Sequence, residues 1–144
     1  MSLSSFALEL NSLSIHLVRW ARRADEAMGL PPARASALSV LVFGGDRTMR
    51  ELADAEMVTQ ATMCRVVDGL EASGLARRVP NPDDGRSFVV RATAKGRRLM
   101  ARGRQARVDR LTQVLAAVPA EERPTVERAL RLLRDALTQV AVVE

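Results

Sequence analysis

Residues 46–93 constrain the fold more than any other part of the chain. Thr48 is followed three residues later by Glu51, a spacing that has the form of a capping box and predicts the start of a short helix over ELADAE. The chain then turns, and Thr59 is placed to cap a second helix over residues 60–73. Two short helices joined by a tight turn are therefore expected.

A β-hairpin is expected directly after these helices. Gly74 ends the second helix, and residues 75–79 and 87–90 are rich in strand formers. The segment between them, PNPDDGR, is dense in turn formers and predicts an extended tip. Helix, turn, helix and hairpin in this order form a surface that can place a helix in a DNA major groove and a basic loop in the minor groove.

Long amphipathic helices are expected on both sides of this segment. Gly29 ends a first helix of about seven turns, whose apolar residues recur at spacings of three and four. A helix over 32–43 follows. Thr93 caps a long helix to about residue 118, and a last helix becomes regular near Pro124 after a looser turn over 120–123. The apolar stripe of the first helix comprises Phe6, Leu10, Leu13, Leu17, Trp20 or Ala21, Ala24 and Met28.

Charge and composition narrow the class of function. Residues 47–110 carry 14 Arg/Lys and 8 Asp/Glu, a net charge of +6, and the rest of the chain carries 8 and 9, a net charge of −1. This basic focus suits a polyanionic partner. With one cysteine (Cys64) and one histidine (His16), neither an internal disulfide nor a Cys/His metal cage is expected. No nucleophile–base pair or phosphate-cradling loop points to an enzyme. A cytoplasmic protein is expected, because neither a membrane-length apolar run nor a signal peptide is seen.

At this point the chain resembles a known family. The segment MRELADAEMVTQATMCRVVDGLEASGLARRVPNPDDGRSFVVRATAKG is similar to the winged helix-turn-helix core of the MarR (multiple antibiotic resistance regulator) family. The cues are the LA…(V)TQ.T..R.VD.LE..GL.R pattern, the D-D-x-R tip and the T-x-K-G opening of the next helix. The resemblance covers the whole chain, read as a single domain over 1–144. It implies dimerisation helices at about 3–28 and 108–142, a DNA-binding lobe at about 32–93 and a connecting helix at about 94–118.

The resemblance also implies a mode of action. Family members commonly bind pseudo-palindromic operators as homodimers, and many release DNA when a small aromatic or lipophilic molecule, or an oxidant, binds. Two departures stand out. Gly69 occupies a position where many members carry a larger, often basic residue, so one phosphate contact is expected to be missing. Peroxide sensors of the family usually place their cysteine in the first helix, and this chain has none there.

The second helix of the pair carries the candidate contacts with bases. Its first turns hold short or forked hydrogen-bonding side chains, the turns with which recognition helices contact base edges. Gln pairs with adenine and Arg with guanine. The alternatives are a simple cap at Thr59 and a solvated residue at Arg65. The candidate residues are Thr59, Gln60, Ala61, Thr62 and Arg65.

The hairpin carries the second set of candidate DNA contacts. Arg86 lies at the tip between Asp84 and Ser87, and a neighbouring carboxylate is expected to hold its guanidinium in one pose. An Arg in a narrow minor groove recognises shape and negative potential. Arg77 and Arg78 flank the wing and are expected to contact phosphates. The alternatives are an ordinary charged turn and protection of an edge strand.

A candidate effector site lies on the first helix. His16, Arg19 and Trp20 share one face, and an aromatic ring beside a cation suits an aromatic carboxylate. The alternative is packing of Trp20 in a dimer core. Cys64 is expected to be a small half-buried residue of the recognition helix, with oxidant sensing as its alternative. The basic run over 95–107 is either a solvated face, an extension of the field toward DNA or the lining of an anion-binding cleft.

The sequence thus predicts a mainly α fold with a small β-hairpin wing, flanked by N- and C-terminal dimerisation helices. The expected function is sequence-specific binding of double-stranded DNA by a homodimeric repressor of its own or neighbouring genes, released by a small aromatic or lipophilic effector. No cofactor, metal or membrane partner is expected. Two alternatives stay open: a winged-helix protein-interaction module without specific DNA binding, and an oxidant sensor acting through Cys64.

Overall fold

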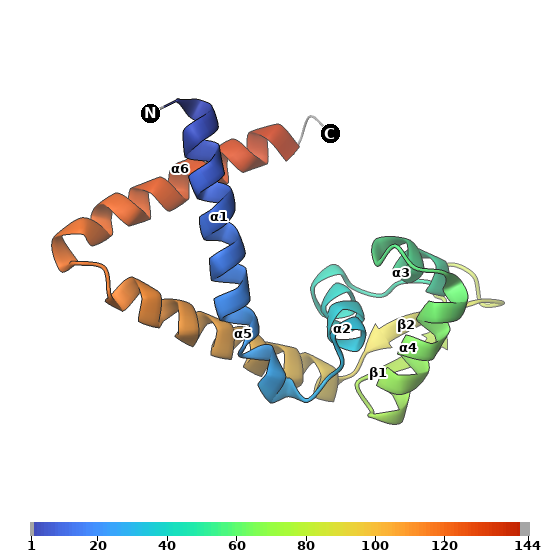
Figure 1. Cartoon of the computed structure of the whole chain (residues 1–144). Coiled ribbons are helices and arrows are strands. Elements are labelled where there is room, and N and C mark those ends of the chain that lie inside the picture. Colours follow the sequence, from blue (N-terminus) through green and yellow to red (C-terminus); the bar gives the residue numbers. More distant parts are fainter. Residues whose placement is uncertain (1, 142–144) are drawn as a thin grey trace.

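The structure, a computed structural model, describes residues 2–141 and is mainly helical with one two-stranded hairpin (Figure 1). The predicted fold class is therefore confirmed. In chain order the elements are α1 (Leu3–Arg22), the 3₁₀ turn η1 (Asp25–Met28), α2 (Pro32–Gly44), α3 (Met49–Ala55), α4 (Gln60–Ala72), β1 (Ala76–Pro80), β2 (Phe88–Ala92), α5 (Ala94–Ala116), the 3₁₀ turn η2 (Ala120–Glu122) and α6 (Arg123–Ala141).

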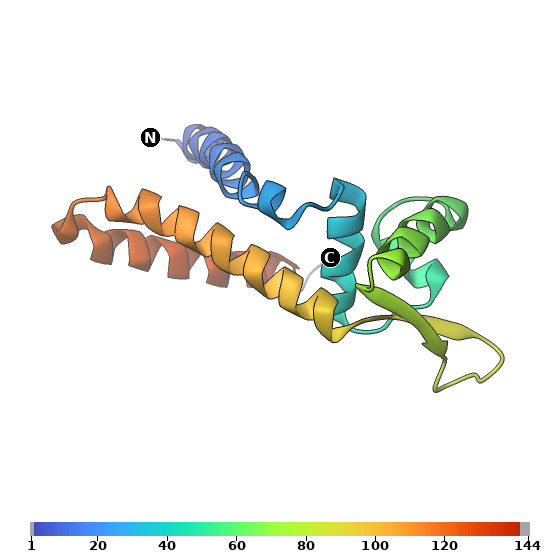
Figure 2. The same ribbon diagram turned by 90° about the horizontal axis from the view of Figure 1, so that it is seen from below.

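A compact lobe holds the hydrophobic core. Within it α2, α3 and α4 pack on one another, and the hairpin lies against α2 and α4 (Figures 1 and 2). β1 and β2 are antiparallel, from Ala76 opposite Ala92 to Pro80 opposite Phe88. The sequence placed the first strand one residue too early, because the Leu75 amide bonds the Leu70 carbonyl at the end of α4. The largest fully buried side chains are Leu38, Leu52, Met63, Val67, Leu70, Val90 and Met100.

Three predicted helix caps are confirmed. Thr48 Oγ1 accepts from the Glu51 amide at 3.2 Å, and Glu51 Oε2 accepts from the Thr48 amide at 2.8 Å, which completes the capping box of α3. Thr59 and Thr93 each accept from the backbone amide three residues on, at 3.1 Å. These caps satisfy amides that a helix start leaves without partners.

The first α-helix ends six residues earlier than the predicted end at Met28. The Ala24 amide bonds the Ala21 carbonyl, so the chain tightens into a 3₁₀ step. The Trp20 carbonyl is taken by Arg110 of α5, whose Nε donates to it at 2.8 Å. A side chain from another helix thus closes the end of α1.

The long helix α5 leaves the lobe and packs against α1 and η1. Gly103 allows a close approach to η1, because a Cβ there would meet the sulfur of Met28. α5 ends at Ala116, and η2 leads into α6. η2 lies where the sequence predicted a looser turn before the last helix. Every side chain of α6 that the structure describes, from 123 to 140, is exposed or half-buried.

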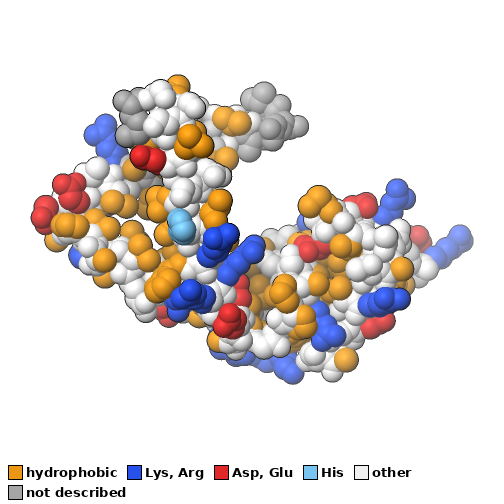
Figure 3. Space-filling model, viewed as in Figure 1, with side chains coloured by type: hydrophobic (Ala, Val, Ile, Leu, Met, Phe, Trp, Pro, Cys, Tyr) orange, Lys and Arg blue, Asp and Glu red, His pale blue; other side chains and the backbone are white. Residues whose placement is uncertain are grey.

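Large apolar side chains lie uncovered outside the lobe (Figure 3). Within the described chain most of them belong to α1, α5 and α6, and several are more than half exposed, such as Leu8 and Leu137 at 69% each. A single chain in water leaves these stripes solvated, which is a feature of interaction surfaces. The residues are Leu3, Phe6, Leu8, Leu10, Leu13, Ile15, Val18, Val108, Val114, Leu115, Leu130, Leu132, Leu133, Leu137 and Val140.

Among residues 2–141 no single helix has the length and apolarity needed to cross a membrane. The pair formed by Leu3–Met28 and Pro32–Gly44 reaches both in combination, but it is bent by 94° at its break.

Candidate nucleic-acid interface

α4 turns one face to the core and another to solvent. Met63, Val67 and Leu70 are buried, so the rows between them are directed away from the lobe. The first turns of the helix are therefore open to an approaching molecule. All five residues predicted to contact bases are exposed: Thr59, Gln60, Ala61, Thr62 and Arg65.

The polar groups of this face differ in how far they are already engaged. Thr59 Oγ1 accepts from the Thr62 amide at 3.1 Å and donates to Thr62 Oγ1 at 3.0 Å, so Thr59 serves as the cap. Within residues 2–141 the side chains of Gln60 and Arg65 make no hydrogen bond or ion pair. An amide and a guanidinium with unused donors thus lie exposed on the first turns of α4, and both are groups that can pair with base edges.

The wing tip is shaped by its own short side chains. Asn81 accepts from the Asp83 amide at 3.0 Å and donates to Ser87 Oγ at 3.1 Å. The expected grip of a carboxylate on the Arg86 guanidinium is wrong: Asp84 Oδ1 accepts from the backbone amide of Arg86 at 3.1 Å. The short side chain of Asp84 lies two residues before Arg86, so its carboxylate reaches the Arg86 amide more easily than the end of the long Arg86 side chain. Arg86 is exposed, and no carboxylate of the described chain pairs with its guanidinium.

Arg78 differs sharply from its neighbour Arg77. Its Nη2 donates to Asp68 at 2.9 Å, its Nη1 pairs with Glu71, and its guanidinium lies 5.6 Å from the ring centre of Phe88. Burial opposes the charge, but the hydrogen bond to Asp68 and the negative charges outweigh it, so the pKa of Arg78 is raised. Arg78 therefore braces the wing against α4, whereas Arg77 is exposed. Sequence spacing gave no sign of this brace, because its carboxylates lie on a different element.

Gly69 of α4 meets a cation that the sequence analysis did not single out. The guanidinium of Arg34, from the first turn of α2, lies directly over it. A Cβ built on Gly69 would be 2.6 Å from Arg34 Nη2, so no other residue type fits there unless Arg34 moves. A contact between residues 35 positions apart leaves no periodic signal in the sequence.

Comparison with known proteins decides the family. A model described as MarR family matches residues 28–87. The chain is 31% identical over 127 residues to an uncharacterized HTH-type transcriptional regulator of Mycobacterium bovis, covering 88% of this chain and 89% of the relative. The chain belongs to the MarR family.

Solved structures share the fold of this MarR protein. It superposes with a TM-score of 0.87 on a transcriptional regulator from Thermotoga maritima, at 22% identity, covering 96% of this chain and 98% of that one. The TM-score is 0.71 to a mutant of MepR from S. aureus bound to an oligodeoxyribonucleotide, at 17% identity, covering 92% and 97% of the two chains. At these identities the likeness concerns the fold.

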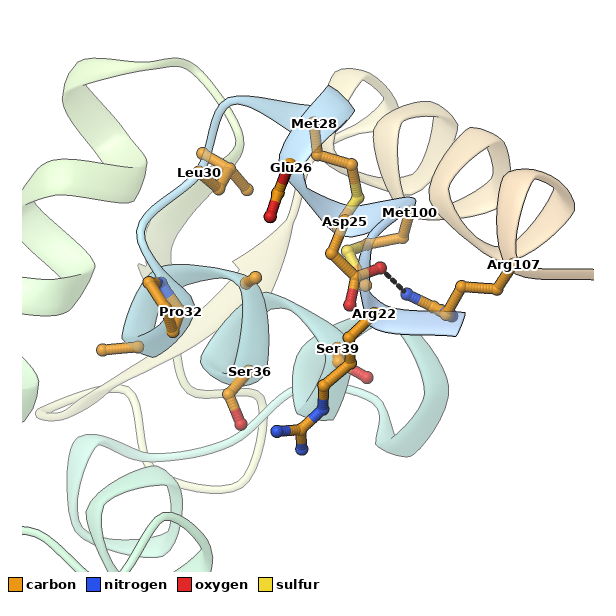
Figure 4. A pocket seen from close by; sticks show the side chains of 12 residues that line it. Arg22, Asp25, Glu26, Met28, Leu30, Pro32, Ser36, Ser39, Met100 and Arg107 are labelled. Atoms are coloured by element: carbon orange, nitrogen blue, oxygen red, sulfur yellow. Dashed lines mark hydrogen bonds and ion pairs between the residues drawn. The ribbon is translucent and has the colours of Figure 1, made fainter. Parts of the chain in front are cut away.

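A large hollow lies where the MarR lobe meets the flanking helices (Figure 4). Its volume is about 770 Å³, and its walls come from the end of α1, η1, α2 and α5. Arg107 Nη1 of α5 pairs with Asp25 of η1 at 2.5 Å across one end, while Met28, Leu30 and Met100 supply apolar wall. Arg22 also lines the hollow and pairs with no carboxylate of the described chain.

The predicted effector residues line a different, smaller hollow. His16, Arg19 and Trp20 border a space of about 420 Å³ between α1 and α5, together with Leu13, Leu17, Arg23 and Val114. Trp20 also has a structural role, because its indole N–H donates to the Arg110 carbonyl at 3.1 Å and so links α1 to α5. Whether this hollow binds an effector stays a prediction.

The basic run at the start of α5 is partly occupied with internal contacts. Lys95 Nζ donates to the Ser73 carbonyl at 2.9 Å, and Arg97 Nη1 donates to the Ala92 carbonyl at 2.8 Å. Both therefore fasten α5 to the lobe. Arg98, Arg102 and Arg104 are exposed, as a solvated face requires. Cys64 is half-buried against the core, in the position expected of a small packing residue.

Proposed function

We propose that this MarR protein is a cytoplasmic homodimer that represses its own or neighbouring genes by binding a pseudo-palindromic operator. One observation carries the proposal: the exposed first turns of α4 and the exposed wing-tip Arg86 belong to one braced lobe. In a winged helix-turn-helix of this kind, the recognition helix enters the major groove and the wing reaches the adjacent minor groove. The MepR structure bound to an oligodeoxyribonucleotide supports this use of the fold.

Each predicted contact has a distinct chemistry. Gln60 donates to and accepts from an adenine edge, and Arg65 donates in bidentate fashion to guanine. Arg86 is drawn to the negative potential of a narrow minor groove. Arg77 contacts a backbone phosphate. Asp84 and Ser87 act indirectly, by holding the backbone of the wing tip.

The uncovered apolar stripes of α1, α5 and α6 support the homodimer. Residues such as Phe6, Leu133 and Leu137 are exposed on one chain and form a surface typical of obligate partners. Pairing two chains through these helices places two α4 helices in successive major grooves, about 34 Å apart on one side of the DNA. The operator then mirrors the twofold symmetry of the protein.

The proposal includes release by a small aromatic or lipophilic effector. We place it in the larger hollow, because a molecule there touches both α2 of the lobe and the junction of α1 with α5. An effector shifts the lobes only as far as it binds one arrangement better than the other. Arg22 supplies a cation for an aromatic carboxylate.

DNA binding is tested by fluorescence anisotropy with a labelled duplex spanning the promoter of the protein's own gene and a scrambled duplex of equal length. We expect preference for the promoter duplex and a linear fall of log affinity with log salt. Arg65→Ala is expected to reduce the preference, and Arg86→Ala to weaken binding. Arg128→Ala, on exposed α6, is the matched control. Equal binding to both duplexes, unchanged in Arg65→Ala and Arg86→Ala, would overturn autoregulation.

Dimerisation is tested by analytical ultracentrifugation of the wild type and Leu137→Glu. We expect a dimer that the variant splits, because a charge enters an apolar interface while the lobe, which α6 does not contact closely, stays folded. A monomeric wild type at micromolar concentration would refute the homodimer.

Effector release is tested with benzoate as a probe aromatic carboxylate, added to the protein–DNA complex. Arg22→Gln alters the larger hollow and Arg19→Gln the smaller one, three residues away on the same helix. Loss of release in Arg22→Gln alone supports our placement, and loss in Arg19→Gln alone assigns the effector to the His16–Trp20 hollow. No release from the wild type would exclude simple aromatic carboxylates such as benzoate as effectors.

A further inference from the structure

The contact between Arg34 and Gly69 brings a guanidinium to the recognition helix from outside it. Arg34 belongs to the first turn of α2, and its Nε, Cζ and Nη2 all lie where a side chain at position 69 would begin. The contact exists only because residue 69 has no Cβ. Glycine in the middle of a helix is less stabilising than alanine, so the arrangement lowers the stability of α4.

Helix geometry places this guanidinium beside the predicted DNA-binding face. Gly69 follows Thr62 by seven residues and Arg65 by four, so the three positions share one side of α4. Thr62 and Arg65 are exposed on that side. Arg34 therefore extends the row of polar groups toward the C-terminal end of α4, where Gly69 offers none.

The positive charge of Arg34 has no structural explanation within the described chain. A helix N-terminus carries partial positive charge and disfavours a cation in its first turn. The first turn of α2 contains no acidic residue to offset it. No carboxylate among residues 2–141 pairs with Arg34, whereas Arg78, Arg91 and Arg107 each have one.

We infer that Arg34 binds a DNA backbone phosphate beside the recognition helix, and that Gly69 is the residue that admits it. This inference rests on the proposed DNA-binding function. A phosphate is the expected partner, because the guanidinium arrives from the flank of α4, and a fork of N–H donors matches phosphate oxygens. The contact adds affinity without adding sequence preference.

The test uses the full-length protein, the promoter duplex and the scrambled duplex over a range of salt. Arg34→Gln is expected to weaken binding to both duplexes by a similar factor, roughly threefold to tenfold, and to reduce the salt slope by about 1 per lobe. Gly69→Ala, which displaces Arg34, is expected to have a similar effect. Arg128→Gln removes the same charge from α6 and is expected to leave the slope nearly unchanged.

A combined variant makes the test specific. Gly69→Ala added to Arg34→Gln is expected to cause no further loss, and Gly69→Lys in that background is expected to restore the slope by supplying a cation at the same place. Thermal unfolding followed by circular dichroism verifies that each variant is folded. The inference is overturned if Arg34→Gln behaves like Arg128→Gln while Arg86→Ala still weakens binding. Wild-type protein that binds neither duplex would instead refute the proposed function.

Discussion

Trp20 and Arg110 exchange two hydrogen bonds, each from a side chain to the backbone of the other residue. The indole N–H of Trp20 donates to the Arg110 carbonyl at 3.1 Å, and Arg110 Nε donates to the Trp20 carbonyl at 2.8 Å. The Arg110 guanidinium also lies 4.2 Å from the centre of the indole ring. This reciprocal pair ties the end of α1 to the middle of α5.

Removing Arg110 is expected to weaken that junction. Arg110→Ala removes both the charged donor that Arg110 offers to the Trp20 carbonyl and the cation–π contact with the indole ring. The variant should lower the free energy of unfolding by about 1–2 kcal/mol. Trp20→Phe removes one hydrogen bond and should cost about 1 kcal/mol. Urea unfolding followed by circular dichroism at fixed protein concentration measures both. Arg110→Ala as stable as the wild type would show that the pair contributes nothing net.

Arg77 and Arg78 are adjacent but are expected to respond differently to substitution. Arg78→Gln breaks the bonds to Asp68 and Glu71 and should lower the free energy of unfolding by about 1 kcal/mol, a value reduced by partial solvent exposure. Arg77→Gln should stay within about 0.5 kcal/mol of the wild type. Urea unfolding distinguishes them, and equal values for the two variants would contradict the brace.

Met57 lies in the left-handed region with φ of 53° and is 91% exposed, in the turn between α3 and α4. Met57→Gly relieves the steric cost of the left-handed backbone and loses almost no packing, although glycine also gives the unfolded chain more conformational freedom. We expect the free energy of unfolding to rise by about 0.5–1 kcal/mol on balance. Met57→Ala keeps the Cβ and should give no gain. The melting temperatures of the two variants provide the comparison, and a stabilised Met57→Ala would mean that strain is not the cause.

The stability of α3 is expected to depend on pH through Glu51. The backbone hydrogen bond from Thr48 lowers the pKa of Glu51 below its ordinary value of 4.5, with help from the Thr48 side chain. The folded state binds this proton less readily than the unfolded state, so the stabilisation is complete above about pH 4.5 and is lost as the pH falls through the lowered pKa. In Glu51→Gln this part of the acid dependence should disappear. Unfolding midpoints of the two proteins are measured from about pH 3 to about pH 7. A parallel loss of stability in both proteins over this range would contradict the assignment to Glu51.

Local signals in the sequence predicted the lobe well. Thr48, Thr59 and Thr93 cap helices through atoms within three residues of themselves, so their spacing alone identifies the helix starts. The five residues of α4 expected to contact bases on the basis of their position in its first turns are all exposed in the structure. The prediction of the fold succeeded where each element is specified by its own residues.

The errors and omissions arose where distant elements meet. The early end of α1 depends on Arg110, which is 90 positions away from Trp20. Gly69 predicts a missing phosphate contact when only α4 is considered, but the space is filled by Arg34 from α2. Arg78 appeared to be a wing cation like Arg77 because its carboxylate partners are on another element. No periodicity in the chain encodes such contacts.

The 23 residues of α5 also make it a lever arm. At 1.5 Å per residue the arm from Arg110, at the junction with α1, to Ala94, at the lobe, is about 24 Å long, so a tilt of about 5° at this junction carries the lobe through about 2 Å. A bound molecule that moves Arg107 or Arg110 only slightly would therefore cause a larger displacement at the other end of α5. That displacement is enough to take a recognition helix out of register with its groove.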